Sequence, residues 1–208
     1  MAPPSTGARE KLLEAAFKVI REKGYTATTV DDLCQAAGVT KGAFFHHFSS
    51  KEALGVAAAE HWAVTTGAMF EAAPYHAPAD ALERVLAYVD FRKAILGGEM
   101  AEFTCVAGTM AQEVHDTHPA IAAACGAAIT GHAATLVADI AQAMADHGIE
   151  NAGWTAESLA LHTQIVLQGA FVVAKATDDR QVVAESLDHL RRYIELLFSA
   201  DNREETIQ

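Results

Sequence analysis

The sequence predicts an all-α protein, on three observations. Apolar residues recur with the 3.6-residue period of an amphipathic helix along most of the chain, as in the early run Leu12, Leu13, Ala16, Phe17 and Ile20. No segment alternates apolar and polar residues for long enough to predict a strand. Only five prolines are present, so long stretches are free to be helical. We expect about nine helices, with an N-terminal three-helix helix-turn-helix domain followed by a larger helical domain.

Composition excludes several classes of protein. The 208 residues are 51% hydrophobic and 20% charged, which is an ordinary globular balance. No apolar run reaches the roughly 18 residues of a membrane-spanning helix, and Met1 to Glu10 lack the apolar core of a secretory signal. Three cysteines are too few and too scattered for a disulfide framework or a zinc ribbon. We therefore expect a cytoplasmic protein with no membrane partner.

Charge is distributed unevenly along the chain. The net charge is −12, yet residues 1–55 carry 7 Lys/Arg against 6 Asp/Glu, while residues 56–208 carry 8 against 21. A near-neutral N-terminal quarter joined to an acidic remainder suggests two functional parts. The acidic part would repel phosphates and keep a nucleic acid to one face, although acidic surfaces also simply aid solubility.

Local signals divide the N-terminal quarter into helices. Gly24 ends the first helix, because glycine accepts a left-handed conformation cheaply. Thr29 with Asp32 three residues later is a capping box that predicts a second helix. Gly38 breaks that helix, and Thr40 caps a short third one.

A fourth, longer helix is expected to follow a second capping box, formed by Ser49 and Glu52, and to run to about Phe70. Beyond it, periodicity predicts helices over 81–96 and 103–115. Pro119 suits the first turn of a long helix running to about residue 146. Two amphipathic stretches complete the chain, with apolar stripes between 159 and 173 and between 183 and 198.

The segment from the second helix to the third has the layout of a helix-turn-helix that reads DNA. In that layout the later helix enters the major groove with its N-terminal residues toward base edges, here Thr40, Lys41, Ala43 and His46. Lys41 can donate to guanine or to phosphate, and Ala43 can contact a thymine methyl group. Thr29 and Thr40 place hydroxyl groups at helix N-termini, which suits phosphate, and Lys51 could clamp the backbone. A short helical pair with a glycine turn also occurs in proteins that never bind DNA.

The same segment resembles the TetR family of bacterial transcriptional regulators. The resemblance covers residues 9 to about 55, and the spacing between its motifs matches the family throughout. The matching motifs are Gly24-Tyr25, Thr28-Thr29-Val30, Ala36-Ala37-Gly38-Val39, Thr40-Lys41-Gly42, Phe44-Phe45-His46-His47-Phe48 and Lys51-Glu52-Ala53-Leu54. It implies a DNA-binding domain over 1–52 and an effector-binding and dimerisation domain over 53–208. Phe45 departs from the family, which usually has a tyrosine there that bonds a phosphate. The residues that we expect at the DNA are Thr28, Thr29, Thr40, Lys41, Gly42, Ala43, Phe45, His46, His47 and Lys51.

The resemblance also implies a homodimer through the last two helices and a small-molecule effector. Gly169 and Ala170 would let helices approach closely, and the apolar stripe over 187–198 is broad enough to cover both core and partner. An effector pocket is mostly apolar with a few polar anchors, of which Gln164 is a further candidate. Taken singly, such apolar residues and lone histidines are more often plain core than pocket. The candidate pocket residues are Trp62, Phe70, Phe91, Phe103, Met110, Gln112, His132, Trp154, His162 and Phe171.

Other functions find less support in the sequence. His115 and His118 have the spacing of one helix face, but no cluster of ligands completes a metal site, so we expect no metal and no cofactor. Cys105 and Cys125 are expected to behave as small hydrophobic residues. No Gly-rich phosphate loop, GxSxG elbow or HExxH motif appears, so we expect no enzyme. The leading hypothesis is a repressor that a ligand releases from double-stranded operator DNA. The alternatives are a helical assembly or ligand-binding protein without DNA function, or an enzyme without a recognisable motif.

Overall fold

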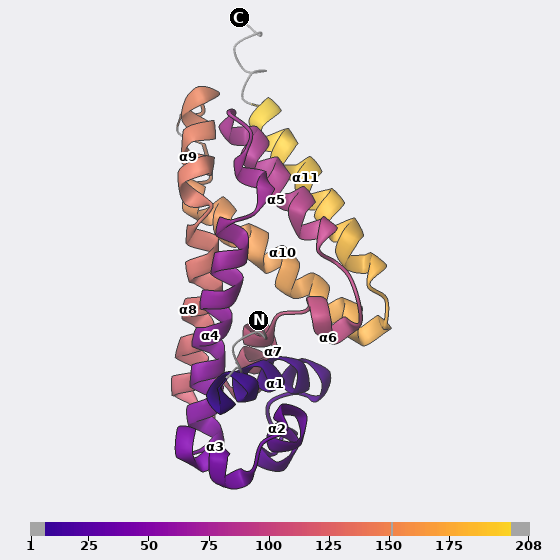
Figure 1. The fold of residues 1–208 in the computed structure, drawn as a ribbon. Helices are drawn as coiled ribbons and strands as arrows, with labels where there is room; N and C mark the ends of the chain where they lie inside the picture. Colours follow the sequence, from indigo (N-terminus) through magenta and orange to yellow (C-terminus); the bar gives the residue numbers. More distant parts are fainter. Residues whose placement is uncertain (1–6, 151, 201–208) are drawn as a thin grey trace, which may run out of the picture. The chain divides into compact units, whose positions relative to one another are not determined.

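The computed structural model describes residues 7–150 and 152–200, and every regular element in these residues is helical (Figure 1). The predicted all-α class is therefore confirmed. The chain forms two compact units, and each contains two separate stretches of sequence. The first unit takes residues up to 68 together with 99–129. The second takes 69–98 together with the residues from 130 onward.

The core of the first unit is built around α1. Leu12, Leu13 and Ile20 of α1 are buried against Leu33 of α2 and Phe44 of α3, which forms the core of the unit. The last part of the core comes from helices far away in sequence, because Met110 and Ile121 join it. The helices of this unit are α1 (Ala8–Lys23), α2 (Val30–Ala37), α3 (Lys41–His47), most of α4 (Lys51–Glu71), α6 (Met100–Phe103), α7 (Val106–Val114) and most of α8 (Pro119–Ala134).

In the second unit, four helices pack against one another, and ion pairs join them. α11 contacts both α10 and α5, and α9 contacts both α5 and α10. Lys93 of α5 lies 2.6 Å from Asp188 of α11, and Arg84 of α5 lies 2.8 Å from Asp139 of α9. The elements of this unit are the end of α4, the short 3₁₀ helix η1 (Pro74–His76), α5 (Ala81–Ala94), the end of α8, α9 (Val137–Asp146), α10 (Ala156–Thr177) and α11 (Gln181–Ala200).

The predicted caps of the N-terminal helices are confirmed with one correction. Thr29 and Asp32 form a reciprocal capping box at α2, and Gly38 ends that helix with a φ of 64°. Thr40 accepts a hydrogen bond from the backbone of α3. The capping box predicted for Ser49 and Glu52 is wrong. Ser50 caps α4 instead, because its hydroxyl oxygen accepts from the backbone nitrogen of Ala53 at 3.0 Å.

The described residues contain eleven α-helices, because the helix expected to run to residue 146 is divided into α8 and α9, and the short α6 precedes α7. The helix expected over 103–115 begins only at Val106, as α7. Just before it, Arg21 of α1 donates to the carbonyl oxygens of Glu102 and Thr104. The helix expected to run to residue 146 ends at Ala134. There the backbone nitrogen of Thr135 bonds three residues back to His132, which tightens the last turn.

Two helical stretches of the described chain are long and apolar enough to cross a membrane by length and composition alone, Pro119–Asp146 and Ala156–Thr177. This is weak evidence, because a core helix passes the same test. Ala156–Thr177 is α10, which packs against both α9 and α11.

Candidate functional site

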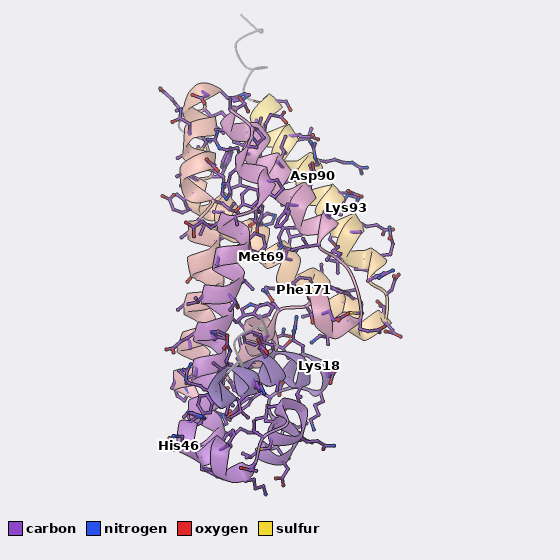
Figure 2. The ribbon with its side chains drawn as sticks, in the orientation of Figure 1. Lys18, His46, Met69, Asp90, Lys93 and Phe171 are labelled. Atoms are coloured by element: carbon purple, nitrogen blue, oxygen red, sulfur yellow. The ribbon has the colours of Figure 1, made fainter. Side chains whose placement is uncertain are left out.

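The α2–turn–α3 segment has a buried side and an exposed side. Phe44 is fully buried and Phe48 is 4% exposed, so both pack in the core of the first unit as the sequence indicated. On the other side Phe45 is 57% exposed. Figure 2 shows His46 at the outer edge of this unit. The exposed residues of α3 are Lys41, Gly42, Phe45, His46 and His47, and Ala43 is half-buried.

Lys41, the first residue of α3, forms an ion pair with α2. Its Nζ lies 2.7 Å from Oδ1 of Asp31, and both side chains are mostly exposed. The hydrogen bond from the ammonium to this carboxylate raises the pKa of Lys41. The two helices of the turn thus present one cation and one anion side by side at their N-terminal ends. Sequence analysis did not single out Asp31, because its partner is ten residues away across the turn.

The three threonines predicted to lie at the DNA are in different environments. Thr29 and Thr40 are exposed, and each accepts a hydrogen bond from the backbone of the helix that it caps. Thr28 is only 1% exposed, and its hydroxyl group donates to the carbonyl oxygen of Gly24 at 2.6 Å. The Thr28 hydroxyl group is therefore turned into the protein, whereas those of Thr29 and Thr40 stay at the surface.

Lys51 forms hydrogen bonds within the protein. Its Nζ donates to the carbonyl oxygens of Tyr25 at 3.0 Å and Thr28 at 2.9 Å, and it lies 4.4 Å from the centre of the Tyr25 ring. Partial burial lowers the pKa of Lys51. The ammonium therefore holds the loop before α2, which differs from the predicted clamp on a DNA backbone.

The same loop is also bound by a side chain of α7. Oε1 of Glu113 accepts from the backbone nitrogen of Tyr25 at 3.0 Å, and Oε2 accepts from that of Thr26 at 2.8 Å. Glu113 therefore accepts from backbone N–H groups of the loop that leads into α2, and Lys51 donates to backbone carbonyl oxygens of the same loop. No local pattern marks Glu113, because its partners are almost ninety residues away in sequence.

Three predicted effector-binding residues come together in the second unit. The ring of Phe70 lies 5.5 Å from Phe91 and 4.4 Å from His132, measured between ring centres. The guanidinium carbon of Arg92 lies 5.0 Å from the centre of the Phe70 ring. Tyr88, which the sequence analysis passed over, completes the group, 5.9 Å from Phe70.

A chain of hydrogen bonds runs through this aromatic group. Nε2 of Gln164 donates to the hydroxyl oxygen of Tyr88 at 2.9 Å, and that hydroxyl lies 3.0 Å from Nε2 of His132. Since the Tyr88 oxygen accepts from Gln164, its own proton points to His132, whose Nε2 then accepts. Burial, and secondly the charge of Arg92, lowers the pKa of His132 to about 4. His132 is therefore neutral at pH 7, in agreement with its role as an acceptor.

The other predicted effector-binding residues lie elsewhere. In the first unit, Met110 is fully buried in the core, Trp62 packs on Phe17 at 5.1 Å, and Gln112 donates to its own helix. Phe103 ends α6 in the same unit. In the second unit, Trp154 packs on Phe198, His162 packs on Tyr193, and Phe171 is a buried residue of α10.

Figure 2 also shows Asp90 and Lys93 along α5, at the side where α11 runs. Asp90 pairs with Arg191 at 3.2 Å, and Lys93 pairs with Asp188. These charges join two helices of the second unit, so they have a structural role. In the described ranges, no group of three or more His, Cys, Asp or Glu side chains is arranged to hold a metal ion.

Comparison with known proteins decides the family. The family "Bacterial regulatory proteins, tetR family" matches residues 12–58. The family "Transcriptional regulator LmrA/YxaF-like, C-terminal domain" matches residues 78–189, which is more than half of the chain. The chain belongs to the TetR family.

Individual relatives match only part of this TetR-family chain. The repressor KstR2 of Rhodococcus jostii is 41% identical over 61 residues, a match that covers 26% of this chain and 30% of that protein. Matches to the first curated relatives span only 19% to 31% of their length.

Solved structures resemble the chain over most of its length. A TetR-family regulator from Agrobacterium tumefaciens has a TM-score of 0.77 at 20% identity, covering 89% of this chain and 96% of that one. A cysteine variant of the TetR-family regulator CifR, solved with 26-bp double-strand operator DNA, has a TM-score of 0.73 at 21% identity, covering 91% and 98%. At these identities the likeness shows the TetR-family fold alone.

Proposed function

We propose that the chain is a ligand-responsive transcriptional repressor that binds double-stranded operator DNA as a homodimer. The main support for the proposal is the capped α2–turn–α3 segment. One side of α3 is buried through Phe44, and the other side exposes residues between Lys41 and His47. A helix-turn-helix of this form places the N-terminus of its second helix at base edges in the major groove. The operator-bound state of the structurally similar CifR variant supports the same role.

The DNA-binding residues that we propose are those that remain accessible. Lys41, Gly42 and His46 would lie toward the base edges, and Phe45 would make an apolar contact with a sugar or a thymine methyl group. Thr29 and Thr40, at helix N-termini, would lie near phosphates, together with His47. The DNA-binding domain proposed for residues 1–52 also depends on Lys51 and Glu113, which hold the loop before α2 without facing the DNA.

The homodimer would form through α10 and α11. Large apolar side chains are exposed on both helices, and Ile165 and Leu196 are the most exposed of them, at 58% and 66%. Symmetric dimers are the commonest oligomers, and a two-fold protein matches a two-fold operator. The proposed interface comprises Leu161, Ile165, Val172 and Val173 of α10 with Tyr193 and Leu196 of α11.

The effector would bind near the aromatic group of the second unit. Phe70, Phe91 and His132 combine apolar rings with a neutral imidazole, and Tyr88 and Gln164 supply further polar atoms. Binding sites for small molecules have this composition. Release of DNA requires the effector to bind the DNA-free conformation more tightly than the DNA-bound one.

DNA binding is tested by fluorescence anisotropy with the duplex upstream of the protein's own gene and a scrambled duplex, each at low and physiological salt. We expect tight binding to the upstream duplex alone that survives physiological salt. Equal, weak binding to both duplexes that collapses with salt would reflect phosphate attraction only and would contradict the proposal.

Dimer formation is tested by sedimentation of the wild type and of Leu196→Glu. We expect a dimer for the wild type and a folded monomer for the variant, since a charge on the apolar face has no partner there. The surface change Glu14→Gln on α1 serves as the control. A wild type that sediments as a monomer at all concentrations would overturn this part of the proposal.

A further inference from the structure

We infer that Asp31 and Lys41 act as one unit that reads a single G·C base pair. The inference rests on the proposed DNA-binding function and adds a specificity determinant to it. Lys41 is the first residue of α3, the position that approaches base edges in a helix-turn-helix. Asp31 is the second residue of α2, and its carboxylate lies 2.7 Å from the Lys41 ammonium.

The donor and acceptor pattern of this pair is complementary to the major-groove edge of G·C. Guanine presents two acceptors, N7 and O6, and cytosine presents the N4 amino group beside them. The Lys41 ammonium has three donors, and the Asp31 carboxylate is an acceptor only. Lys41 can therefore donate to guanine while Asp31 accepts from cytosine of the same pair, with the two side chains still adjacent.

An A·T pair matches less well. It presents one donor, the N6 amino group of adenine, between the acceptors N7 and O4. Asp31 could accept from that amino group, but Lys41 would then reach a single acceptor on one side of it. The lysine would lose the paired contact with N7 and O6 that favours guanine.

The position of the pair makes such a contact accessible. Both side chains are mostly exposed, and an exposed ion pair contributes little to stability, so both can reorient toward a base. An acidic side chain among DNA-facing residues otherwise opposes binding, because it repels phosphates. A base amino group is the one feature of the groove floor that a carboxylate binds well.

The test uses the full-length protein and a pool of duplexes with a randomised central segment. The duplex that wild type enriches is then altered so that each G·C pair becomes A·T in turn, and affinities are measured by anisotropy. We expect one G·C position at which this change lowers affinity roughly 5- to 150-fold. Asp31→Ala and Lys41→Ala should each remove most of that discrimination.

A double-mutant cycle decides whether the two residues act together. If they read the same pair, the Asp31→Ala, Lys41→Ala protein loses little more discrimination than either single variant. Asp31→Ala alone should also raise affinity for a scrambled duplex, because it removes a negative charge near the phosphates. Circular dichroism checks that each variant keeps its helices.

The matched control is Glu22→Gln. Glu22 forms a similarly exposed ion pair with Lys18 on α1, and Figure 2 shows Lys18 well away from His46 of α3. We expect this variant to discriminate between duplexes as the wild type does. A protein that selects no sequence from the pool would overturn the DNA-binding function itself, and this inference with it.

Either of two results would contradict the inference about Asp31 and Lys41 while leaving the proposed DNA-binding function intact. In one, Asp31→Ala raises affinity for all duplexes equally and leaves base discrimination unchanged, so that Asp31 only repels phosphates. In the other, the position that responds to Asp31 and Lys41 prefers A·T.

Discussion

Gly24 and Glu113 approach so closely that any side chain on Gly24 would displace the Glu113 carboxylate. A Cβ atom placed on Gly24 would lie 2.5 Å from Oε1 of Glu113, which is bonded to the backbone of Tyr25 and Thr26. Gly24 also has a φ of 87°, which other residues rarely adopt. The turn after α1 therefore requires glycine for two independent reasons.

We expect Gly24→Ala to lower the free energy of unfolding by about 1–3 kcal/mol, measured by urea denaturation. In a Glu113→Ala background the clash is removed but the backbone strain remains, so the same substitution should cost less there. Equal costs in the two backgrounds would mean that the side chain of Glu113 moves aside freely.

We expect Lys51 to stabilise the fold rather than to bind a DNA phosphate. Lys51→Met removes an ammonium that bonds the carbonyl oxygens of Tyr25 and Thr28, and we expect a loss of about 1.5–3 kcal/mol of unfolding free energy. The dependence of DNA affinity on salt should keep the wild-type slope if measured well below the melting temperature. A slope reduced by about one would instead identify Lys51 as a phosphate contact.

Two phenylalanines of the helix-turn-helix segment, three positions apart, should differ sharply when each is replaced by alanine. Phe48→Ala should lower the free energy of unfolding by about 3–5 kcal/mol, because the ring is buried. Phe45→Ala should change it by less than about 0.5 kcal/mol, because the ring is exposed, while weakening DNA binding. Urea denaturation and anisotropy on the same preparations measure both effects. A Phe48→Ala protein as stable as the wild type would contradict the observed burial.

Two buried tyrosines form a matched pair for the role of a hydroxyl group. The hydroxyl of Tyr25 is buried and has no hydrogen-bond partner among the residues that the structure describes, so Tyr25→Phe should leave the free energy of unfolding unchanged or raise it by up to about 1 kcal/mol. The hydroxyl of Tyr88 bonds both His132 and Gln164, so Tyr88→Phe should cost about 1–3 kcal/mol. Equal thermal stabilities of the two variants would refute this distinction.

His132 should make stability fall in mild acid. Its pKa in the folded protein is about 4, below the ordinary 6.5, so between these values the unfolded chain binds a proton that the folded chain does not. The free energy of unfolding should therefore fall as the pH drops through this window and level off below it. Urea denaturation at about pH 7 and about pH 5 should show a smaller fall for His132→Gln than for the wild type. The same fall in both proteins would place the acid sensitivity elsewhere.

The sequence alone determined the features that depend on near neighbours along the chain. The capping box of Thr29 and Asp32, the cap at Thr40 and the left-handed Gly38 each involve residues within a few positions, so local pattern was sufficient. The buried faces of the helices followed from periodicity for the same reason, and Phe44 and Phe48 are examples. The family resemblance also lay in this contiguous segment.

Only the tertiary structure decided the features that join distant parts of the chain. Arg21 donates hydrogen bonds to carbonyl oxygens just before α7, and Glu113 accepts hydrogen bonds from the loop before α2. Each of these contacts joins residues more than eighty positions apart in the sequence. Lys51 likewise binds carbonyl oxygens of a loop more than twenty residues earlier in the sequence. The ion pair of Asp31 depends on where the fold places Lys41. Hydrogen bonds and charges act over a few ångströms in space, whatever the separation in sequence, so no local pattern could reveal which partners would meet.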